Sequence, residues 1–339
     1  FSGMMMPLMN FVSNIGYVGI CVLGGFLSLR GSITVGDIQA FTQYVRNFTQ
    51  PITQIANISN VLQQTAAAAE RVFDFLEEEE EPADPQDSIS QQQIDGSVYF
   101  AHVHFGYVPE KTIINDFSAI IQPGTQVAIV GPTGAGKTTM VKLLMRFYDV
   151  NEGAILLNGY DVKQFNRADL RDSFGMVLQD TWLYNDTIRE NIRFGRLDAT
   201  DEEVIAAAEA AQVDHFVRTL PQGYDTVLNE EATNVSQGQK QLLTIARTII
   251  SDPKILILDE ATSSVDTRTE ILIQRAMDEL TKGRTSFIIA HRLSTIRNAD
   301  LILVMKDGDI VETGNHEELL RKGGFYAELY QSQFADVTE

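Results

Sequence analysis

Cysteine is nearly absent from this sequence of 339 residues, which contains only Cys21. A single cysteine excludes a disulfide within the chain and is compatible with a reducing compartment. Basic residues are also scarce: 26 Lys and Arg stand against 46 Asp and Glu, which gives a net charge of −20. This acidic balance argues against nucleic acid as a partner and against electrostatic docking on anionic lipid.

Charge of either sign is missing from the N-terminus, because residues 1–29 contain no charged side chain. About 20 helical residues cross the hydrocarbon core of a bilayer, so this run is long enough to span a membrane. A secretory signal peptide and a buried helix of a soluble protein are the alternatives. The signal peptide is disfavoured because no basic segment precedes the run. The charges of residues 1–69 sum to +1. Residues 70–339 therefore carry a net charge of −21, which brings the total for the chain to −20.

A second helical pattern follows, in which apolar residues recur at spacings of three and four from Ile38 to Leu62. A helix over residues 35–75 would measure about 60 Å, twice the thickness of a bilayer core. We therefore expect it to project beyond the membrane, and a soluble amphipathic or coiled-coil helix is the alternative. These patterns predict that residues 1–76 are the C-terminal part of an α-helical transmembrane domain, with helices at about 4–29 and 35–75.

An acidic segment separates this region from the rest of the chain. Five glutamates, Glu77 to Glu81, are followed by Pro82, Pro85 and several glutamines. Like charges and prolines bury little surface and favour an extended chain. We expect a linker over residues 77–94 and a second domain over residues 95–339.

The second domain contains a phosphate-binding motif that matches G-x-x-x-x-G-K-[ST]. The matching residues are Gly131, Pro132, Thr133, Gly134, Ala135, Gly136, Lys137 and Thr138. An apolar run over 126–130 predicts a buried strand before it, and apolar residues up to Phe147 predict a helix over 139–147 after it. Backbone N–H groups of such a loop, together with the helix N-terminus, attract phosphate. We expect Lys137 to reach the β- and γ-phosphates of a nucleotide and the Thr138 hydroxyl to bind Mg²⁺.

Two carboxylates, Asp259 and Glu260, follow the aliphatic run 255–258. A continuous apolar run fits a central parallel strand, and ligands bind at the carboxyl ends of such strands. Asp259 is a candidate for the Mg²⁺ shell, and Glu260 is a candidate general base that activates water. An exposed acidic turn is the alternative for this pair.

From about Val98 to Tyr330, the chain resembles the nucleotide-binding domain of ATP-binding cassette (ABC) transporters. Ser236-Gln237-Gly238-Gln239 resembles the family's signature motif, which caps the γ-phosphate of ATP held by the opposite subunit. The resemblance implies an α/β P-loop NTPase fold with a mixed sheet and a helical signature subdomain, preceded by two membrane-type helices.

The resemblance also assigns roles to single residues that would carry no weight alone. Gln179 matches the loop that senses the metal and the membrane domain, and Asp266 matches the loop that crosses the dimer interface. His291 matches the switch histidine at the γ-phosphate, and Tyr107 matches the aromatic that stacks on adenine. The catalytic residues expected are therefore Glu260, His291, Gln179 and Lys137, and the metal ligands expected are Thr138, Gln179 and Asp259. Nucleotide contacts are expected from Tyr107, the motif 131–138, Thr139, Ser236, Gly238, Gln239 and Asp266.

The signature departs from the usual Leu-Ser-Gly-Gly-Gln, because Val235 precedes the serine and Gln237 occupies the first glycine position. A side chain at 237 is tolerable only if that residue has a negative φ. Such variants resemble one subunit of heterodimeric bacterial exporters. We expect the partner to be a second ABC exporter subunit, either an identical chain or, as this variant favours, a different one.

These observations predict an ATPase subunit of an ABC exporter that uses ATP and Mg²⁺, exports an unidentified substrate and contacts the lipid bilayer. It would lie in the plasma (inner) membrane as part of a multi-pass protein, with its ATPase domain in the cytoplasm. Exporters of this type carry more membrane helices than the two found here, so we expect the chain to be a C-terminal fragment. A non-transport ABC ATPase and a regulatory subunit that binds ATP without turnover are the alternatives. Trp182 and Tyr184 are candidates for the surface that receives the membrane domain, and ordinary packing is the alternative for both.

Overall fold

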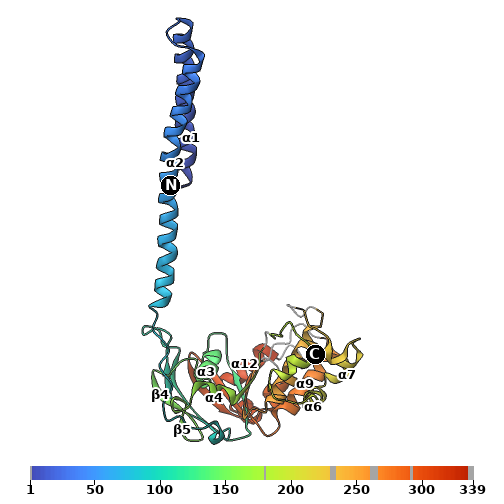
Figure 1. Cartoon of the computed structure of the whole chain (residues 1–339). Helices are drawn as coiled ribbons and strands as arrows, with labels where there is room; N and C mark the ends of the chain where they lie inside the picture. Colours follow the sequence, from blue (N-terminus) through green and yellow to red (C-terminus); the bar gives the residue numbers. More distant parts are fainter. Residues whose placement is uncertain (1, 179–180, 230–233, 260–265, 291–292, 335–339) are drawn as a thin grey trace. The chain divides into compact units, whose positions relative to one another are not determined.

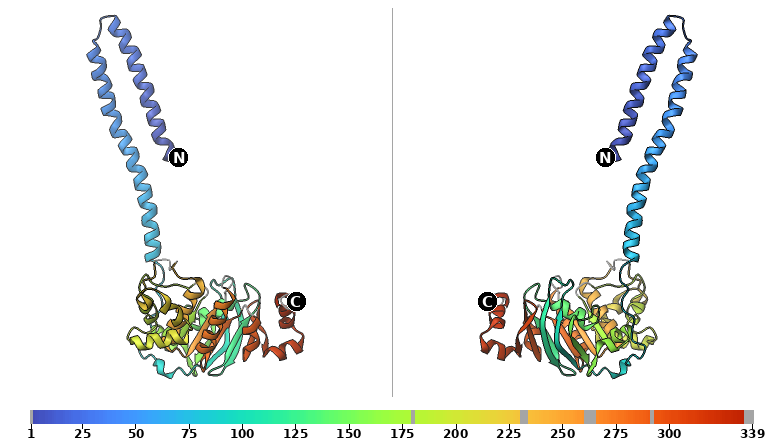
Figure 2. Two further views of the ribbon diagram at one scale, coloured as in Figure 1. Left: turned by 90° about the vertical axis from the view of Figure 1, so that its right-hand side faces the viewer. Right: turned by 90° about the vertical axis from the view of Figure 1, so that its left-hand side faces the viewer.

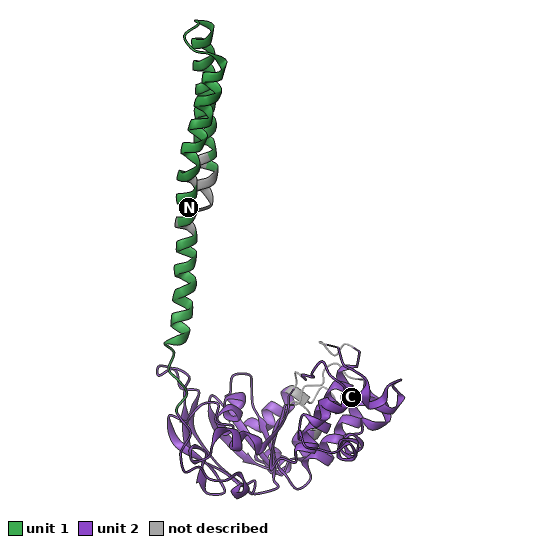
Figure 3. Cartoon of the chain, in the orientation of Figure 1, with its two compact units in different colours: residues 1–82 green, residues 83–339 purple. Residues whose placement is uncertain are grey.

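The computed structural model describes residues 2–178, 181–229, 234–259, 266–290 and 293–334. The chain divides into two compact units, residues 1–82 and 83–339 (Figure 3). The first unit is a helical hairpin of α1 (Ser2–Leu29) and α2 (Val35–Leu76) (Figures 1 and 2). The two helices expected from the sequence are therefore present, and both belong to the first unit.

The hairpin is closed by a capped turn and by close packing of its two helices. The Thr34 hydroxyl accepts a hydrogen bond from Asp37 N at 3.3 Å, and the Asp37 carboxylate accepts one from Thr34 N at 2.8 Å. This reciprocal capping box fixes the start of α2. Near the turn, a Cβ atom on Gly24 would lie 2.9 Å from Ile38 Cγ1, so the helices approach closely there because position 24 has no side chain.

Within the described residues, α1 contains the one segment that is long and apolar enough to cross a membrane. This segment, Asn10–Leu29, has a mean hydropathy of 1.7. Most of its large apolar side chains are exposed to the surroundings, Phe11, Val22 and Leu23 among them. A helix that is apolar on its outer surface needs an apolar environment, which a bilayer supplies.

The described residues of the second unit form two sheets. The four-stranded antiparallel sheet has the order β2-β1-β4-β5, and the six-stranded sheet has the order β10-β9-β3-β8-β7-β6. In the larger sheet, β9, β3, β8, β7 and β6 are parallel, and β10 pairs antiparallel with β9. This mixture of a parallel sheet, an antiparallel sheet and helices confirms the expected α/β architecture.

The strands are β1 (Val98–Phe105), β2 (Ile114–Ile121), β3 (Gln126–Val130), β4 (Glu152–Leu157), β5 (Tyr160–Asp161), β6 (Phe174–Val177), β7 (Ile255–Asp259), β8 (Thr285–Ile289), β9 (Leu301–Lys306) and β10 (Asp309–Gly314). The α-helices are α3 (Lys137–Leu144), α4 (Arg167–Asp172), α5 (Ile188–Arg193), α6 (Asp201–Ala210), α7 (Asp214–Thr219), α8 (Gln237–Ser251), α9 (Thr267–Thr281), α10 (Leu293–Asn298), α11 (His316–Lys322) and α12 (Phe325–Phe334). Three short 3₁₀ turns are η1 (Gln91–Gln93), η2 (Val162–Gln164) and η3 (Gly223–Asp225).

Two hydrophobic clusters meet at the larger sheet. Ile255 and Ile257 of β7 belong to the cluster between the two sheets, whereas Leu256 and Leu258 belong to the cluster shared with α5 to α9. Alternate side chains of a strand point to opposite faces, so β7 is buried on both. The continuous apolar run of the sequence is thereby explained, and it places Asp259 at the carboxyl edge of the sheet.

The helix after the phosphate-binding motif differs from its expected range. It begins at Lys137 rather than Thr139 and ends at Leu144, because Arg146 adopts a left-handed conformation with φ 52°. The expectation that Phe147 belongs to this helix was wrong, since the residue lies beyond the helix end with its side chain 48% exposed. Its ring lies 4.8 Å from the Arg171 guanidinium.

The segment between the two units was expected to be an extended linker over 77–94. The structure places its second part, residues 83–94, within the second unit. There Ile89 forms a parallel bridge with Phe165, and its N–H donates to Gln164 O at 3.0 Å.

Candidate functional site

The site begins where β3 turns into α3. Gly131 (φ 154°), Gly134 (φ 85°) and Gly136 (φ 100°) adopt backbone conformations that side chains disfavour. A Cβ atom on Gly131 would collide with Met305 O, and one on Gly136 would lie 2.7 Å from Ile114 Cδ1. The glycines are therefore required for the loop to curl tightly at the helix N-terminus, where backbone N–H groups attract an anion.

Lys137 carries the positive charge of this loop. Its Nζ donates hydrogen bonds to Gly131 O at 2.7 Å and Pro132 O at 3.0 Å. Burial lowers the pKa of the Lys137 ammonium, and the negative charge of Asp259 partly offsets this. A phosphate oxygen entering the loop would meet an ammonium that is poorly solvated and therefore strongly attractive to anions.

A cavity of about 500 Å³ opens over the loop. It is lined by Thr133, Gly134, Gly136, Lys137, Thr138, Thr139, Tyr107, Lys111, Ile113, Asp259 and Ile289. The strand register explains the convergence, because Asp259 pairs with Ile289 and Ile289 pairs with Ile129 across β7, β8 and β3. Eight of the expected site residues thus line one cavity: Tyr107, Thr133, Gly134, Gly136, Lys137, Thr138, Thr139 and Asp259. Lys111 and Ile113 also line it, and no pattern in the sequence pointed to them.

Tyr107 lies at the edge of this cavity with 44% of its surface exposed. Its hydroxyl is 3.3 Å from Thr139 Oγ1, which ties it to the start of α3. The rings of Phe105 and Tyr148 each meet its ring edge to face at a centroid distance of 5.0 Å. A rigid and half-exposed aromatic ring beside a phosphate loop suits stacking on a planar base.

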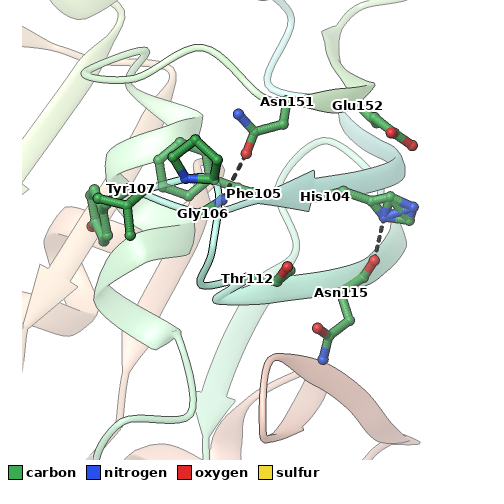
Figure 4. Close-up of a pocket in the computed structure, with 10 residues that line it drawn as sticks. His104, Phe105, Gly106, Tyr107, Thr112, Asn115, Asn151 and Glu152 are labelled. Carbon is green, nitrogen blue, oxygen red and sulfur yellow. Dashed lines mark hydrogen bonds between the residues drawn. The ribbon is translucent and has the colours of Figure 1, made fainter.

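A second cavity of about 740 Å³ is lined by His104, Gly106, Tyr107, Asn115 and Asn151, among others (Figure 4). Asn151 Oδ1 accepts a hydrogen bond from Gly106 N at 2.7 Å, and His104 Nδ1 contacts Asn115 O. This cavity lacks a buried cation, so the smaller cavity over Lys137 is the better phosphate site. Asn151 fixes the backbone next to Tyr107, a role that sequence reasoning missed.

The signature segment forms the start of α8. Ser236 caps the helix, with its Oγ accepting from Gln239 N at 3.3 Å and its N–H donating to Gln239 Oε1 at 2.8 Å. Gln237 is the first residue of α8 and is not among the residues with positive φ. A side chain therefore fits at this position, and its amide donates to Thr181 Oγ1 at 3.3 Å. Ser236 remains exposed and Gly238 is buried at the helix start.

Asp266 caps the next helix, α9. Its Oδ1 accepts hydrogen bonds from Thr269 N at 3.0 Å and Arg268 N at 3.1 Å. A hydrogen bond from the Thr269 side chain, followed by that from the Thr269 N–H, holds the pKa of the Asp266 carboxyl below its usual value. The structure thus gives Asp266 a capping role, and its expected contact with nucleotide stays a prediction.

Three of the expected catalytic residues, Gln179, Glu260 and His291, lie outside the described residues. Each follows a parallel strand of the larger sheet in the chain: β6 ends at Val177, β7 at Asp259 and β8 at Ile289. These carboxyl ends share one edge with the loop after β3, and the roles expected of the three residues stay predictions.

An aromatic cluster lies beyond β6. Trp182 is 60% exposed, its ring centroid is 4.2 Å from that of Tyr184, and Tyr184 is 4.5 Å from Phe194. Arg247 of α8 lies 5.3 Å from the Phe194 ring, and its Nη1 donates to Trp182 O at 3.0 Å. The cluster is therefore packed onto the signature helix while keeping an exposed aromatic face. Sequence reasoning found the first two residues and missed Phe194 and Arg247.

Comparison with known proteins agrees with this geometry. Residues 114–263 match the family described as ABC transporter. The second unit is an ABC-transporter ATP-binding domain. The match covers the phosphate loop, the signature segment and Asp259, whereas Tyr107, Lys111, Ile113 and Ile289 of the cavity lie outside the matched residues.

Relatives that contain this ABC domain extend the similarity over both units. A protein of Mycobacterium bovis named "Fatty acid ABC transporter ATP-binding/permease protein" is 55% identical over 97% of this chain and 52% of its own length. An "ATP-dependent lipid A-core flippase" of Syntrophus aciditrophicus is 41% identical over 97% of this chain and 55% of its own length. The chain thus spans about half the length of the curated relatives that it matches.

A solved structure also matches this chain. The structure of a bacterial Atm1-family ABC exporter with ATP bound has a TM-score of 0.73 and 39% sequence identity. The similarity covers 97% of this chain and 58% of that one. An ABC ATPase fold preceded by N-terminal helices is therefore shared with an exporter.

Proposed function

We propose that this chain is the ATP-hydrolysing subunit of an ABC exporter, in which closure of two ATP-binding domains drives export of a substrate across a membrane. The observation that carries the proposal is the presence, in one chain, of the apolar helix segment Asn10–Leu29 and an ABC ATP-binding domain. Relatives named as permease and flippase support it. The chain would lie in the plasma (inner) membrane as part of a multi-pass protein, with its second unit in the cytoplasm.

In this proposal the cavity over Lys137 holds ATP. The Lys137 ammonium and the N–H groups of the glycine loop bind the phosphates, and the Tyr107 ring stacks on adenine. The Thr138 hydroxyl and the Asp259 carboxylate both line the cavity and are oxygen donors of the kind that Mg²⁺ prefers. When bound there with Gln179 as a third ligand, Mg²⁺ would neutralise charge on the phosphate oxygens.

Glu260 and His291 complete the proposed site. Glu260 would accept the proton of the attacking water, and His291 would donate a hydrogen bond to the γ-phosphate. Both follow strands whose ends border the cavity. ATP drives the cycle only if it binds the closed pair of domains more tightly than the open one.

The proposed partner is a second ABC subunit, because the signature residues Ser236, Gly238 and Gln239 lie on α8 and none of them lines the cavity over Lys137. They would cap the γ-phosphate of ATP held by that partner. Gln237 favours a partner that is not a copy of this chain, since such signature variants resemble one subunit of heterodimeric exporters.

A mixing experiment tests whether ATP sites are shared between chains. Lys137→Ala removes the phosphate contact of a chain's own site, and Ser236→Ala removes the cap that it gives to its partner. If two copies pair, each variant alone is inactive and a mixture regains ATP turnover, because a mixed pair has one intact site. If a different subunit is required, the mixture stays inactive and turnover appears on adding that subunit. Full turnover by Lys137→Ala alone would contradict the proposed function.

A further inference from the structure

The Asp84 carboxylate anchors the segment that leaves the helical hairpin to the rest of the second unit. Its Oδ1 accepts a hydrogen bond from Arg167 Nη1 at 2.7 Å, and its Oδ2 accepts one from Arg167 N at 3.3 Å. Arg146 Nη1 lies 3.8 Å from the same Oδ1. Arg167 and Arg146 are only 7% and 5% exposed. Asp84 thus pairs with two buried cations, unlike a surface ion pair that solvent screens.

Arg146 belongs to the end of the phosphate-loop helix. Its N–H donates to Leu143 O at 3.0 Å, where α3 closes, and its Nε donates to Asp149 Oδ1 at 3.0 Å. Its Nη1 donates to Phe165 O at 3.1 Å. The guanidinium is therefore locked to its surroundings at several points, and it cannot move independently of the end of α3.

The same helix begins at Lys137. Eight residues of α-helix span about 12 Å and behave as a rigid rod. One end of this rod borders the cavity over Lys137, and the other lies two residues before Arg146, whose Nη1 is 3.8 Å from Asp84 Oδ1. A shift of α3 when the loop closes on ATP would therefore move Arg146 and change its contact with Asp84. Asp84 is eight residues from the end of α2.

A second contact lies further along the segment. Ile89 packs against the cluster between the two sheets, and its N–H donates to Gln164 O, one residue before Phe165. Phe165 O is the carbonyl that Arg146 binds. Both contacts of the segment therefore converge on the same short stretch of chain, 164–167, beside the end of α3.

We propose that Asp84 is a positioning residue that couples ATP binding to the segment 83–89 and, through the covalent chain, to α2. This inference rests on the proposed function, because it needs ATP to bind in the cavity over Lys137. It adds a link that requires no docking of other membrane segments. ATP binding fixes α3, α3 fixes Arg146, and the ordered arginine holds Asp84 more tightly.

Thermodynamic linkage gives the proposal a sharp test. If ATP strengthens docking of the segment by some factor, releasing the segment must weaken ATP binding by the same factor. Coupling between sites typically amounts to about 5- to 150-fold. If the ion pairs are only structural, docking is independent of ATP and the two measurements are uncorrelated.

The experiment measures amide hydrogen exchange in the whole chain carrying Glu260→Gln, in lipid nanodiscs, with and without Mg²⁺ and ATP. We expect ATP to slow exchange of the Ile89 and Arg167 amides at least about fivefold. Asp84→Asn, which keeps the shape and removes the charge, should abolish this effect and raise the Kd for ATP by a similar factor. Asp84→Glu, which keeps the charge, should retain both the ATP-dependent slowing of exchange and the parent Kd for ATP. Asp87→Asn, at an exposed position in the same segment, should leave both quantities unchanged.

Unchanged exchange of these amides, while peptides from 131–144 become protected by ATP, would overturn the proposal. That result needs no variant, so it stands even if Asp84→Asn fails to fold. Slowed exchange that persists in a folded Asp84→Asn chain would overturn it as well. Absence of ATP protection at 131–144 would instead contradict the proposed function, so the two failures are distinguishable.

Discussion

Replacing Tyr107 by alanine should weaken ATP binding and leave the fold intact. The ring is 44% exposed at the edge of the cavity over Lys137, and it is held edge to face by Phe105 and Tyr148 at 5.0 Å. Stacking of a base on an aromatic ring contributes about 1–3 kcal/mol, which corresponds to about a 5- to 150-fold change in Kd. Phosphate contacts from the glycine loop remain, so binding should be weakened rather than abolished.

Two further variants separate the ring from its hydroxyl and from its neighbours. Tyr107→Phe removes only the contact with Thr139 Oγ1 at 3.3 Å, a neutral hydrogen bond that contributes about 0.5–1.5 kcal/mol. Because the ring stays, the Kd of Tyr107→Phe for ATP should change far less than that of Tyr107→Ala. Tyr148→Ala removes a supporting ring and is the matched control, with an intermediate effect.

The assay is equilibrium titration with ATP in the Glu260→Gln background, so that hydrolysis does not consume the ligand. Thermal unfolding of each variant checks that it is folded. A Kd for Tyr107→Ala within about twofold of the parent value would refute the assignment of this ring to the base. An equal loss in Tyr107→Phe would show that the hydroxyl, and not stacking, is responsible.

Two predictions concern stability of the second unit. Tyr224→Phe removes a hydrogen bond of 2.6 Å from the tyrosine hydroxyl to Asp214 Oδ1. Hydrogen bonds to charged groups contribute about 1.5–3 kcal/mol to stability, so the Tm of this variant should fall. An unchanged Tm would show that the hydrogen bond contributes nothing. Burial, aided by the charge of Arg297, lowers the pKa of His316 below 6.5. The unfolded chain therefore binds a proton at this histidine more readily than the folded chain does. The free energy of unfolding should decline as the pH falls below about 6.5. His316→Gln should flatten that decline in Tm measured against pH, and an identical pH dependence in the variant would contradict this assignment.

The phosphate loop was predictable because its physics is local. Gly131, Gly136 and Lys137 are separated by a few residues, and the strand and helix that flank them have clear apolar patterns. The carboxyl edge that unites them with Asp259 was predictable too, since a strand buried on both faces reads as a continuous apolar run. These features depend on residue type and spacing, which the sequence displays directly.

Other features depend on contacts between distant segments, which no single-sequence pattern displays. The end of α3 at Leu144 is set by the left-handed conformation of Arg146, which Asp149, Phe165 and Asp84 stabilise. The apolar periodicity alone predicted that the helix continues to Phe147. The docking of residues 83–94 likewise depends on two buried arginines that are far away in sequence, so the segment had only the composition of a linker.

ATP turnover of the chain compared with its Glu260→Gln variant tests the central claim most directly. The measurement is steady-state release of phosphate in lipid, with and without Mg²⁺, by this chain paired with a second copy or with a different subunit, as the mixing experiment decides. We predict turnover that needs Mg²⁺ and falls by at least about 100-fold in the variant, as for loss of a catalytic base, while the Kd for ATP is unchanged. Turnover that persists in Glu260→Gln would contradict the assignment of this chain as the subunit that hydrolyses ATP.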